Sequence, residues 1–408
     1  MSSLTYLALP VLDELDLLPR LLDGLAAQTR QSFELWACVN QPESWWNDSA
    51  KREICDRNLA CLRLLAGETR FPVQVLDRAS PGSGWTDQRQ GVGWARRTLM
   101  DAVSAESHPE SLLVSIDADT EYPPDYLERV AGVLEDPSSY VGVAAPYLHA
   151  RCGDDGVDRA MLRYEIYLRV YALNLWRFGS PYAFTAMGSL ISTRVRCYRA
   201  VGGLEPKRAG EDFYFLQKLC KYGSVAHWLD VDVKPATRLS QRVPIGTGPA
   251  LAMDLEAQRQ RYPIYPYELF DDVRETTELF GDLYRSDQQT PMTTFLKKQL
   301  STDDLWGAMR DNYRKPDQFV RACHDRVDGL RILQYVKSSF DPSSASDDAN
   351  LRRFLDHVYP DDPDRPAWAS GTSWTFASVS VDELDALRHY LKTKEDAWRR
   401  GNAYESPS

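Results

Sequence analysis

Two aspartates separated by one residue, Asp117 and Asp119, come at the end of the apolar run over residues 112–116. Alternate residues of a strand point to the same side, so both carboxylates are expected together where a strand ends. Such carboxylates repel each other unless a cation lies between them or their protonation changes. A divalent cation with oxygen ligands, completed by phosphate oxygens, suits the pair. The spacing therefore favours a metal site for a phosphorylated ligand, and the alternative is a solvated turn that caps the next helix.

Short apolar runs alternate with amphipathic segments in the first part of the chain. Strands are expected near residues 4–9, 33–39, 73–76, 112–116 and 140–145, with helices over 15–27, 51–65, 88–103 and 123–134. This alternation is typical of an α/β domain with a mostly parallel sheet. Ligands of open α/β sheets bind beyond the carboxyl ends of the strands, which is where Asp117 and Asp119 are expected.

The character of the chain changes after about residue 250. Before that point, helical patterns are expected over 157–178 and 211–222. After it, several amphipathic segments occur. Residues 251–408 hold 28 acidic and 21 basic residues, and therefore −7 of the net charge of −11. We expect a catalytic domain over residues 1–250 and a mainly helical C-terminal region over residues 251–408.

Composition excludes several classes of protein. The net charge of −11 leaves no overall basic surface for nucleic acid. No run of about 18 apolar residues occurs, so a membrane-spanning helix is not expected. The N-terminus does not resemble a signal peptide. The seven cysteines are odd in number and contain no C-x-x-C, which favours reduced thiols and a cytoplasmic location.

Five segments, in order, resemble family 2 glycosyltransferases with the GT-A fold, and the resemblance covers roughly residues 4–245. They are Leu-Pro-Val-Leu-Asp-Glu at 9–14, Gly-Val-Gly-Trp-Ala-Arg-Arg at 91–97, Ser-Ile-Asp-Ala-Asp at 115–119, Ala-Met-Gly-Ser at 186–189, and Val-Gly-Gly-Leu followed by Gly-Glu-Asp at 201–212. Arg97 departs from the asparagine usual in the family. Membrane-bound processive members carry Gln-x-x-Arg-Trp, but here Gln241-Arg242 is followed by no tryptophan. A processive polysaccharide synthase is therefore disfavoured.

The resemblance implies a role for each acidic pair. Asp117 and Asp119 would hold Mg²⁺ or Mn²⁺ against the diphosphate of a nucleotide-sugar, with His227 as a candidate third metal ligand. The alternative, and the more common role of a single histidine, is that His227 packs beside Trp228. Asp212 would be the general base that takes the proton of an acceptor hydroxyl, and Glu211 would orient it or bind the acceptor. Carboxylates at a helix start are also favoured by the helix dipole alone.

The resemblance also implies a set of residues around the nucleotide-sugar, namely Pro10, Glu14, Asp77, Arg96, Asp117, Ala118, Gly188 and Arg242. Arg96 is placed to reach either the nucleotide or the Asp-x-Asp loop, and the alternative is a charged outer helix face. Guanidinium groups such as those of Arg238 and Arg242 suit the recognition of diphosphate oxygens or of an acidic acceptor. Gly93 permits close approach of a neighbouring element. An acidic loop residue such as Glu14 or Asp77 is otherwise simply solvated.

The expected activity is metal-dependent transfer of a sugar, most simply from a UDP-sugar, to an acceptor hydroxyl with inversion at the anomeric carbon. The acceptor is a saccharide, a lipid-linked molecule or a small molecule. Tyr164, Tyr167 and Tyr171 lie in one helical pattern that suits peripheral membrane contact, although a core helix or a homodimer surface is more ordinary. A retaining transferase, a nucleotidyltransferase and a degenerate binding scaffold are the alternatives.

Overall fold

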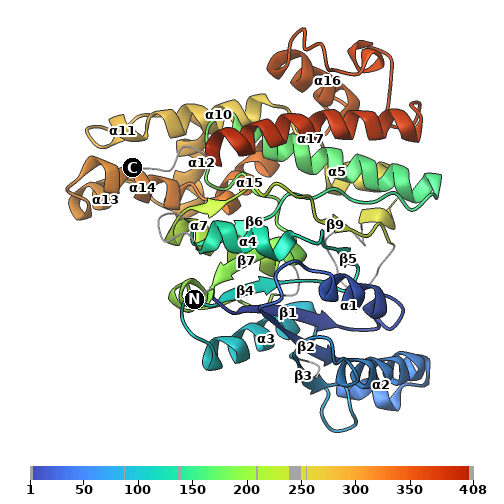
Figure 1. Cartoon of the computed structure of the whole chain (residues 1–408). Coiled ribbons are helices and arrows are strands. Elements are labelled where there is room, and N and C mark those ends of the chain that lie inside the picture. The colour runs from blue at the N-terminus through green and yellow to red at the C-terminus, as the bar shows by residue number, and fades with distance from the viewer. Residues whose placement is uncertain are drawn as a thin grey trace. The chain divides into compact units, whose positions relative to one another are not determined.

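The computed structural model describes residues 3–86, 88–135, 140–207, 210–238, 250–253 and 255–403 (Figure 1). The chain forms two compact units. The first comprises Met1–Met161, Thr185–Ala252 and Arg399–Ser408, and the second comprises Leu162–Phe184 and Met253–Trp398. The first unit holds the sheet, and the regular elements in the described part of the second are helices joined by loops.

The main sheet has seven strands in the order β3-β2-β1-β4-β7-β6-β8. Their bounds are β1 Thr5–Val11, β2 Phe33–Asn40, β3 Val73–Arg78, β4 Leu112–Ser115, β6 Gly142–Ala144, β7 Ile191–Arg194 and β8 Val225–Ala226. Only β7 runs antiparallel to its neighbours β4 and β6. A separate antiparallel pair joins β5 (Thr120–Glu121) to β9 (Lys234–Pro235). The predicted mixed, mostly parallel sheet is confirmed.

Pro10 lies inside β1, a central strand, where proline would normally cost a ladder hydrogen bond. The pairing of β1 with β4 ends two residues earlier, at Ala8 and Ser115, and Pro10 is in register only with Cys38 of β2. The proline therefore lies beyond the last paired residue of β1 and β4, at the carboxyl end of these two strands.

Helices flank the sheet in the first unit. Their bounds are α1 Leu18–Ala26, α2 Arg52–Ala66, α3 Val92–Glu106, α4 Tyr126–Leu134, α6 Val195–Ala200 and α7 Glu211–Tyr222. Helix α3 packs along β1 and β2, α2 along β2 and β3, and α4 along β6 and β7 (Figure 1). The sequence predicts a start for α3 at residue 88, but Gly91 has a left-handed φ of 95°, so the helix begins at Val92.

The long helix α5 (Asp155–Trp176) begins in the first unit and continues into the second. The other helices there are α9 Leu255–Arg261, α10 Glu268–Glu278, α11 Phe280–Leu283, α12 Pro291–Leu300, α13 Gly307–Asn312, α14 Pro316–Arg326, α15 Gly329–Ser339, α16 Asp347–Val358 and α17 Val381–Ala403. Side-chain caps from Thr290, Asp328 and Ser346 begin α12, α15 and α16. The expected helical character of the C-terminal region is confirmed.

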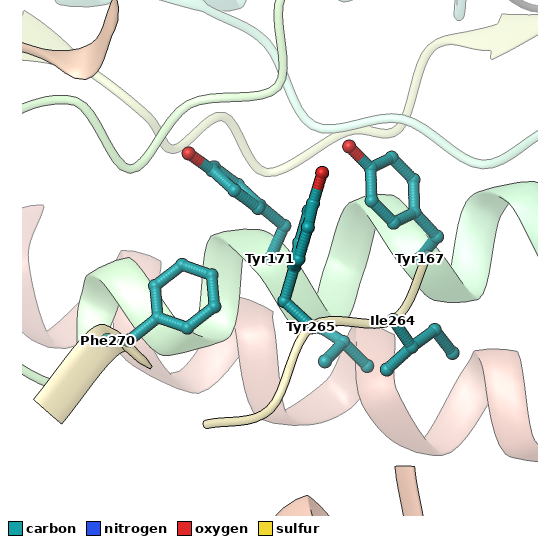
Figure 2. A pocket seen from close by; sticks show the side chains of 6 residues that line it. Tyr167, Tyr171, Ile264, Tyr265 and Phe270 are labelled. Atoms are coloured by element: carbon teal, nitrogen blue, oxygen red, sulfur yellow. The ribbon is translucent and has the colours of Figure 1, made fainter. Parts of the chain in front are cut away.

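The tyrosines of α5 pack within the second unit. The Tyr164 ring lies 4.9 Å from that of Tyr262, and Tyr171 lies 5.2 Å from Phe270. Figure 2 shows Tyr167, Tyr171 and Tyr265 side by side with their hydroxyls pointing the same way. These contacts favour the core-helix interpretation of this stretch. In the ranges that the structure describes, no helix has both the length and the apolar character needed to cross a membrane.

Candidate active site

The segment between β4 and β5 carries Asp117 and Asp119. The Ile116 N–H donates to the Ala8 carbonyl at 3.0 Å, which extends the pairing of β4 with β1 by one bond. The Asp117 N–H donates to the Tyr122 hydroxyl at 3.0 Å, and that hydroxyl donates to the Ser189 carbonyl at 3.3 Å. The backbone of Asp117 is therefore fixed by a buried phenol. No sequence pattern marked Tyr122 for this role.

Arg96 of α3 joins the two acidic pairs. Its side chain is 3% exposed, its Nη1 lies 2.7 Å from Glu211 Oε1, and its Nη2 lies 2.7 Å from Asp117 Oδ1. A buried guanidinium needs such partners, because an unpaired buried charge is strongly unfavourable. The structure thereby brings Asp117 and Glu211 together, although they lie 94 positions apart in the chain.

The carboxyl of Asp117 is harder to ionise than an ordinary aspartate. Burial raises its pKa, Arg96 opposes that increase, and the nearby charge of Asp119 adds to it. The side chains of Asp117 and Asp119 are still 31% and 25% exposed, so both are reachable from solvent. A cation at this pair would relieve the repulsion from Asp119, which raises the pKa of Asp117 less than burial does.

Glu211 and Asp212 occupy the first turn of α7, which follows Gly210 in a left-handed conformation with φ 77°. The Phe213 N–H donates to Asp212 Oδ1 at 2.8 Å. Burial raises the pKa of Asp212 to about 7, with the charge of Glu211 adding to the increase and Arg96 opposing it. A carboxylate with a pKa near neutrality suits general base catalysis.

Close packing at two glycines connects α3 with its neighbours. A Cβ at Gly93 would meet the Lys207 carbonyl at 3.0 Å and Pro206 Cα at 3.4 Å, so α3 lies directly against the segment that leads to α7. The expectation of close approach at Gly93 agrees with this geometry. Gly188, in the short helix η3 (Gly188–Leu190), lies against the guanidinium of Arg96.

Arg238, three residues after β9, holds the second aspartate of the pair. Its Nε donates to Asp119 Oδ2 at 2.8 Å, and its Nη2 donates to Glu14 Oε1 at 2.6 Å. Glu14 is 8% exposed at its side chain, so it is not a solvated loop residue. The Ala236 N–H donates to the Asp119 carbonyl at 3.0 Å, which places the β9 segment beside the Asp-x-Asp loop.

Five carboxylates and two arginines thus make up one site. The carboxylates are Glu14, Asp117, Asp119, Glu211 and Asp212, and the arginines are Arg96 and Arg238. The excess of negative charge opposes binding of a diphosphate unless a cation is added. Mg²⁺ is typically held by one or two carboxylates and substrate phosphates rather than by a cage of protein ligands. The partly exposed, oxygen-bearing pair Asp117 and Asp119 fits such an ion.

Other predicted site residues lie elsewhere or are engaged differently. Asp77 Oδ1 accepts the Ala79 and Ser80 N–H groups, each at 2.9 Å; burial raises the pKa of Asp77, but these hydrogen bonds and that of the Ser80 side chain leave it lowered overall. Asp77 thus shapes the loop after β3. Ala118 is buried between the two aspartates, and Pro10 is the penultimate residue of β1.

His227 and Arg242 are the remaining residues predicted for the site. The His227 carbonyl accepts Arg399 Nη1 at 2.6 Å. Within the part of the chain that the structure describes, no three His, Cys, Asp or Glu side chains form a metal-ligating group. Metal ligation by His227 stays a prediction. Arg242 lies outside the described residues.

The model of the glycosyl transferase family group 2 matches residues 112–277. The matched segment begins with β4 and contains Asp117, Asp119, Gly188, Glu211 and Asp212. Over this segment the chain is similar to family 2 glycosyltransferases, which agrees with the resemblance noted from sequence and supports the assignment as a glycosyltransferase.

No curated protein matches the chain. Solved structures that resemble it include S. aureus TarS residues 1–349 in complex with UDP, with 11% identity over 83% of this chain and 92% of that one and a TM-score of 0.41. Another is the mannosyltransferase PcManGT from Pyrobaculum calidifontis in complex with GDP-Man and Mn²⁺, with 13% identity over 97% of this chain and 87% of that one and a TM-score of 0.38.

Proposed function

We propose that the first unit transfers a sugar from a nucleotide-diphosphate sugar to an acceptor hydroxyl, with inversion at the anomeric carbon. The observation that carries this proposal is the buried Arg96, which ties Asp117 to Glu211. One guanidinium thereby connects the carboxylate pair suited to a metal–diphosphate group with the carboxylate pair suited to proton transfer. A UDP-sugar is the first donor to test.

Asp117 and Asp119 would hold Mg²⁺ or Mn²⁺, which supplies Lewis-acid stabilisation of the departing diphosphate when bound. Arg238 supports this assignment because it already lies at Asp119 Oδ2 and carries a planar fork of donors that suits phosphate oxygens. When a nucleotide-sugar binds, we expect Arg238 to exchange its contact with Asp119 for the diphosphate.

Asp212 would act as the base. Inversion requires one in-line displacement, in which the acceptor oxygen forms a bond to the anomeric carbon as the bond to the diphosphate breaks. The acceptor hydroxyl proton passes to Asp212, whose raised pKa of about 7 makes it a stronger base than an ordinary aspartate. Glu211 remains paired with Arg96 and orients the start of α7.

The test is transfer and donor hydrolysis with UDP- and GDP-sugars, with and without Mn²⁺ or Mg²⁺, followed by NMR assignment of the product anomer. We expect turnover that requires the cation and a product of inverted configuration. Asp212→Asn should lose at least about a hundredfold in kcat while it keeps donor binding, as the usual contribution of a general base implies.

The matched control is Asp56→Asn on α2, whose side chain is 56% exposed and pairs with Arg52 one turn earlier at 3.4 Å. It should retain wild-type turnover. Turnover that is independent of any cation would contradict the metal assignment, retained configuration would contradict inversion, and full activity of Asp212→Asn would contradict the role of the base.

A further inference from the structure

The guanidinium of Arg96 is confined in two ways. Carboxylates bind its two terminal nitrogens, and Gly188 lies against it. A Cβ built on Gly188 would lie 2.3 Å from Nη2, 2.4 Å from Cζ and 2.4 Å from Nη1 of Arg96. Real Cβ atoms do not approach other heavy atoms this closely, so a side chain at position 188 and the present position of Arg96 exclude each other. Gly188 has no left-handed φ, so the requirement for glycine comes from space and not from the backbone conformation.

The far end of an arginine is normally free to move aside, but here it is not. Its two terminal nitrogens are each engaged with a carboxylate at 2.7 Å, and the side chain is 3% exposed. Moving the guanidinium away from a Cβ at position 188 would lengthen the contact with Asp117, the contact with Glu211, or both. The loss of one such buried contact leaves charge uncompensated, which is strongly unfavourable.

We propose that Arg96 is a positioning residue, not a ligand of the nucleotide-sugar, and that Gly188 sets its position. In this arrangement Arg96 fixes the distance between the metal-binding pair and the first turn of α7, and thus the place of Asp212 relative to the sugar. Gly188 excludes every side chain that would push the guanidinium away. The positioning role rests on the proposed function, whereas the packing of Gly188 against Arg96 does not.

Two local features support the arrangement. Gly188 is followed by Ser189, whose carbonyl accepts the Tyr122 hydroxyl that fixes the backbone of Asp117. Gly93, one turn before Arg96 on α3, lets α3 lie against the segment that leads to α7. The Asp117 backbone, the Arg96 side chain and the start of α7 are therefore held by small residues and a phenol, and not by mobile surface groups.

The experiment is a double-mutant cycle with Gly188→Ala and Arg96→Gln. Glutamine ends two atoms short of the guanidinium nitrogens, so it makes room for the alanine methyl. In the wild-type background, Gly188→Ala should lower the melting temperature by about 3 °C or more, the shift expected of a strained core substitution. In the Arg96→Gln background the same change should cost less than a third of that. Equal costs in both backgrounds would overturn the packing argument.

The matched control is Gly132→Ala on α4, where a Cβ meets nothing within 4 Å. This variant should not lower the melting temperature, because alanine favours a helix over glycine. It should also leave turnover unchanged. A loss as large as that of Gly188→Ala would show that any methyl group added to this unit destabilises it.

Kinetics test the positioning role separately. Gly188→Ala and Arg96→Gln should each lower kcat by at least tenfold, while the KM for the donor changes by less than threefold. Lysine can reach one carboxylate at a time, so the kcat of Arg96→Lys should lie between that of Arg96→Gln and that of the wild type. A rise in donor KM with unchanged kcat would instead make Arg96 a donor ligand. If the wild-type chain turns over no nucleotide-sugar, the proposed function fails, but the melting-temperature cycle still decides the packing of Gly188 against Arg96.

Discussion

Arg238 donates from Nε to Asp119 Oδ2 at 2.8 Å, so the carboxylate expected to bind the metal is neutralised by an arginine of the same chain. The contact is partly exposed, with 29% of the Arg238 side chain and 25% of the Asp119 side chain accessible. Glu14 holds the other arm of the guanidinium at 2.6 Å. A cation that binds Asp119 must therefore compete with Arg238.

This competition gives the first prediction. Arg238→Ala should bind Mn²⁺ about three- to tenfold more tightly when no nucleotide is present, because Asp119 is released from its partner. The same variant should bind the nucleotide-sugar more weakly, because it lacks a donor for the diphosphate. Titration calorimetry with Mn²⁺ alone and with the donor measures both constants.

Lys234→Ala is the control, since Lys234 lies on β9 in the same segment and is 50% exposed beside Glu121. It should change neither constant. An unchanged affinity for Mn²⁺ in Arg238→Ala would show that the ion does not use Asp119.

Asp212 gives a prediction about stability. Its pKa in the folded chain is about 7 against an ordinary 3.8, so ionising it costs the folded state free energy as the pH rises from about 4 to about 7. Asp212→Asn avoids that cost. The variant should gain up to about 4 kcal/mol in free energy of unfolding at pH 8 and less than half of that at pH 5. Urea denaturation at the two pH values measures the difference.

The sign of this prediction is the opposite of the usual loss for a buried substitution. A destabilised Asp212→Asn at pH 8 would mean that the carboxylate is stabilised in the fold and that its pKa is not raised. Asp56→Asn on α2 again serves as the comparison, with no gain at either pH.

The same pKa sets the expected pH dependence of the reaction. A base must be deprotonated to accept the proton, so kcat/KM should fall as the pH drops below about 7. A bound cation favours the ionised form and would move the fall to lower pH. The measurement is kcat/KM from pH 5 to pH 9 at saturating Mn²⁺. An acid limb that stays unchanged in the residual activity of Asp212→Asn would remove Asp212 from the role of base.

Local sequence patterns predicted the elements that carry the site. The apolar run before Asp117 and the glycines before Glu211 each mark a backbone event, namely the end of a strand and the start of a helix. Gly202 and Gly203 have φ of 73° and 71°, and Gly210 has φ of 77°, so these glycines are required by left-handed conformations. Features of this kind depend on a few neighbouring residues, which is why they are visible in one sequence.

Contacts across the fold were not predictable in the same way. The partners of Arg96 lie 21 and 115 residues away, and the sequence alone left its target open between the nucleotide and the Asp-x-Asp loop. The need for glycine at position 188 arises from the arginine that lies across it, and no local pattern encodes that. Arg238 and Arg242 are equivalent on chemical grounds, and only the pairing of β5 with β9 places Arg238 beside Asp119.

A last prediction concerns the second unit, where α5 and α17 share a buried ionic network. Glu395 of α17 lies 2.5 Å from Arg169 of α5, and Arg169 also bonds Glu165 at 2.5 Å. Glu165 and Glu395 are completely buried, and Arg169 is 2% exposed. Removing one member of such a network leaves a buried charge without its counterpart. Glu395→Ala should therefore cost about 3–5 kcal/mol in unfolding free energy.

Asp396→Ala is the matched control on the next residue of α17. Asp396 is 19% exposed and pairs with Lys392 one helical turn away, a contact of the kind that contributes about 0.3–0.5 kcal/mol. Thermal and urea denaturation of the two variants should differ by at least about 2 kcal/mol. Equal losses would mean that Arg169 is compensated by Glu165 alone, in which case Glu165→Ala, and not Glu395→Ala, should be the more damaging change.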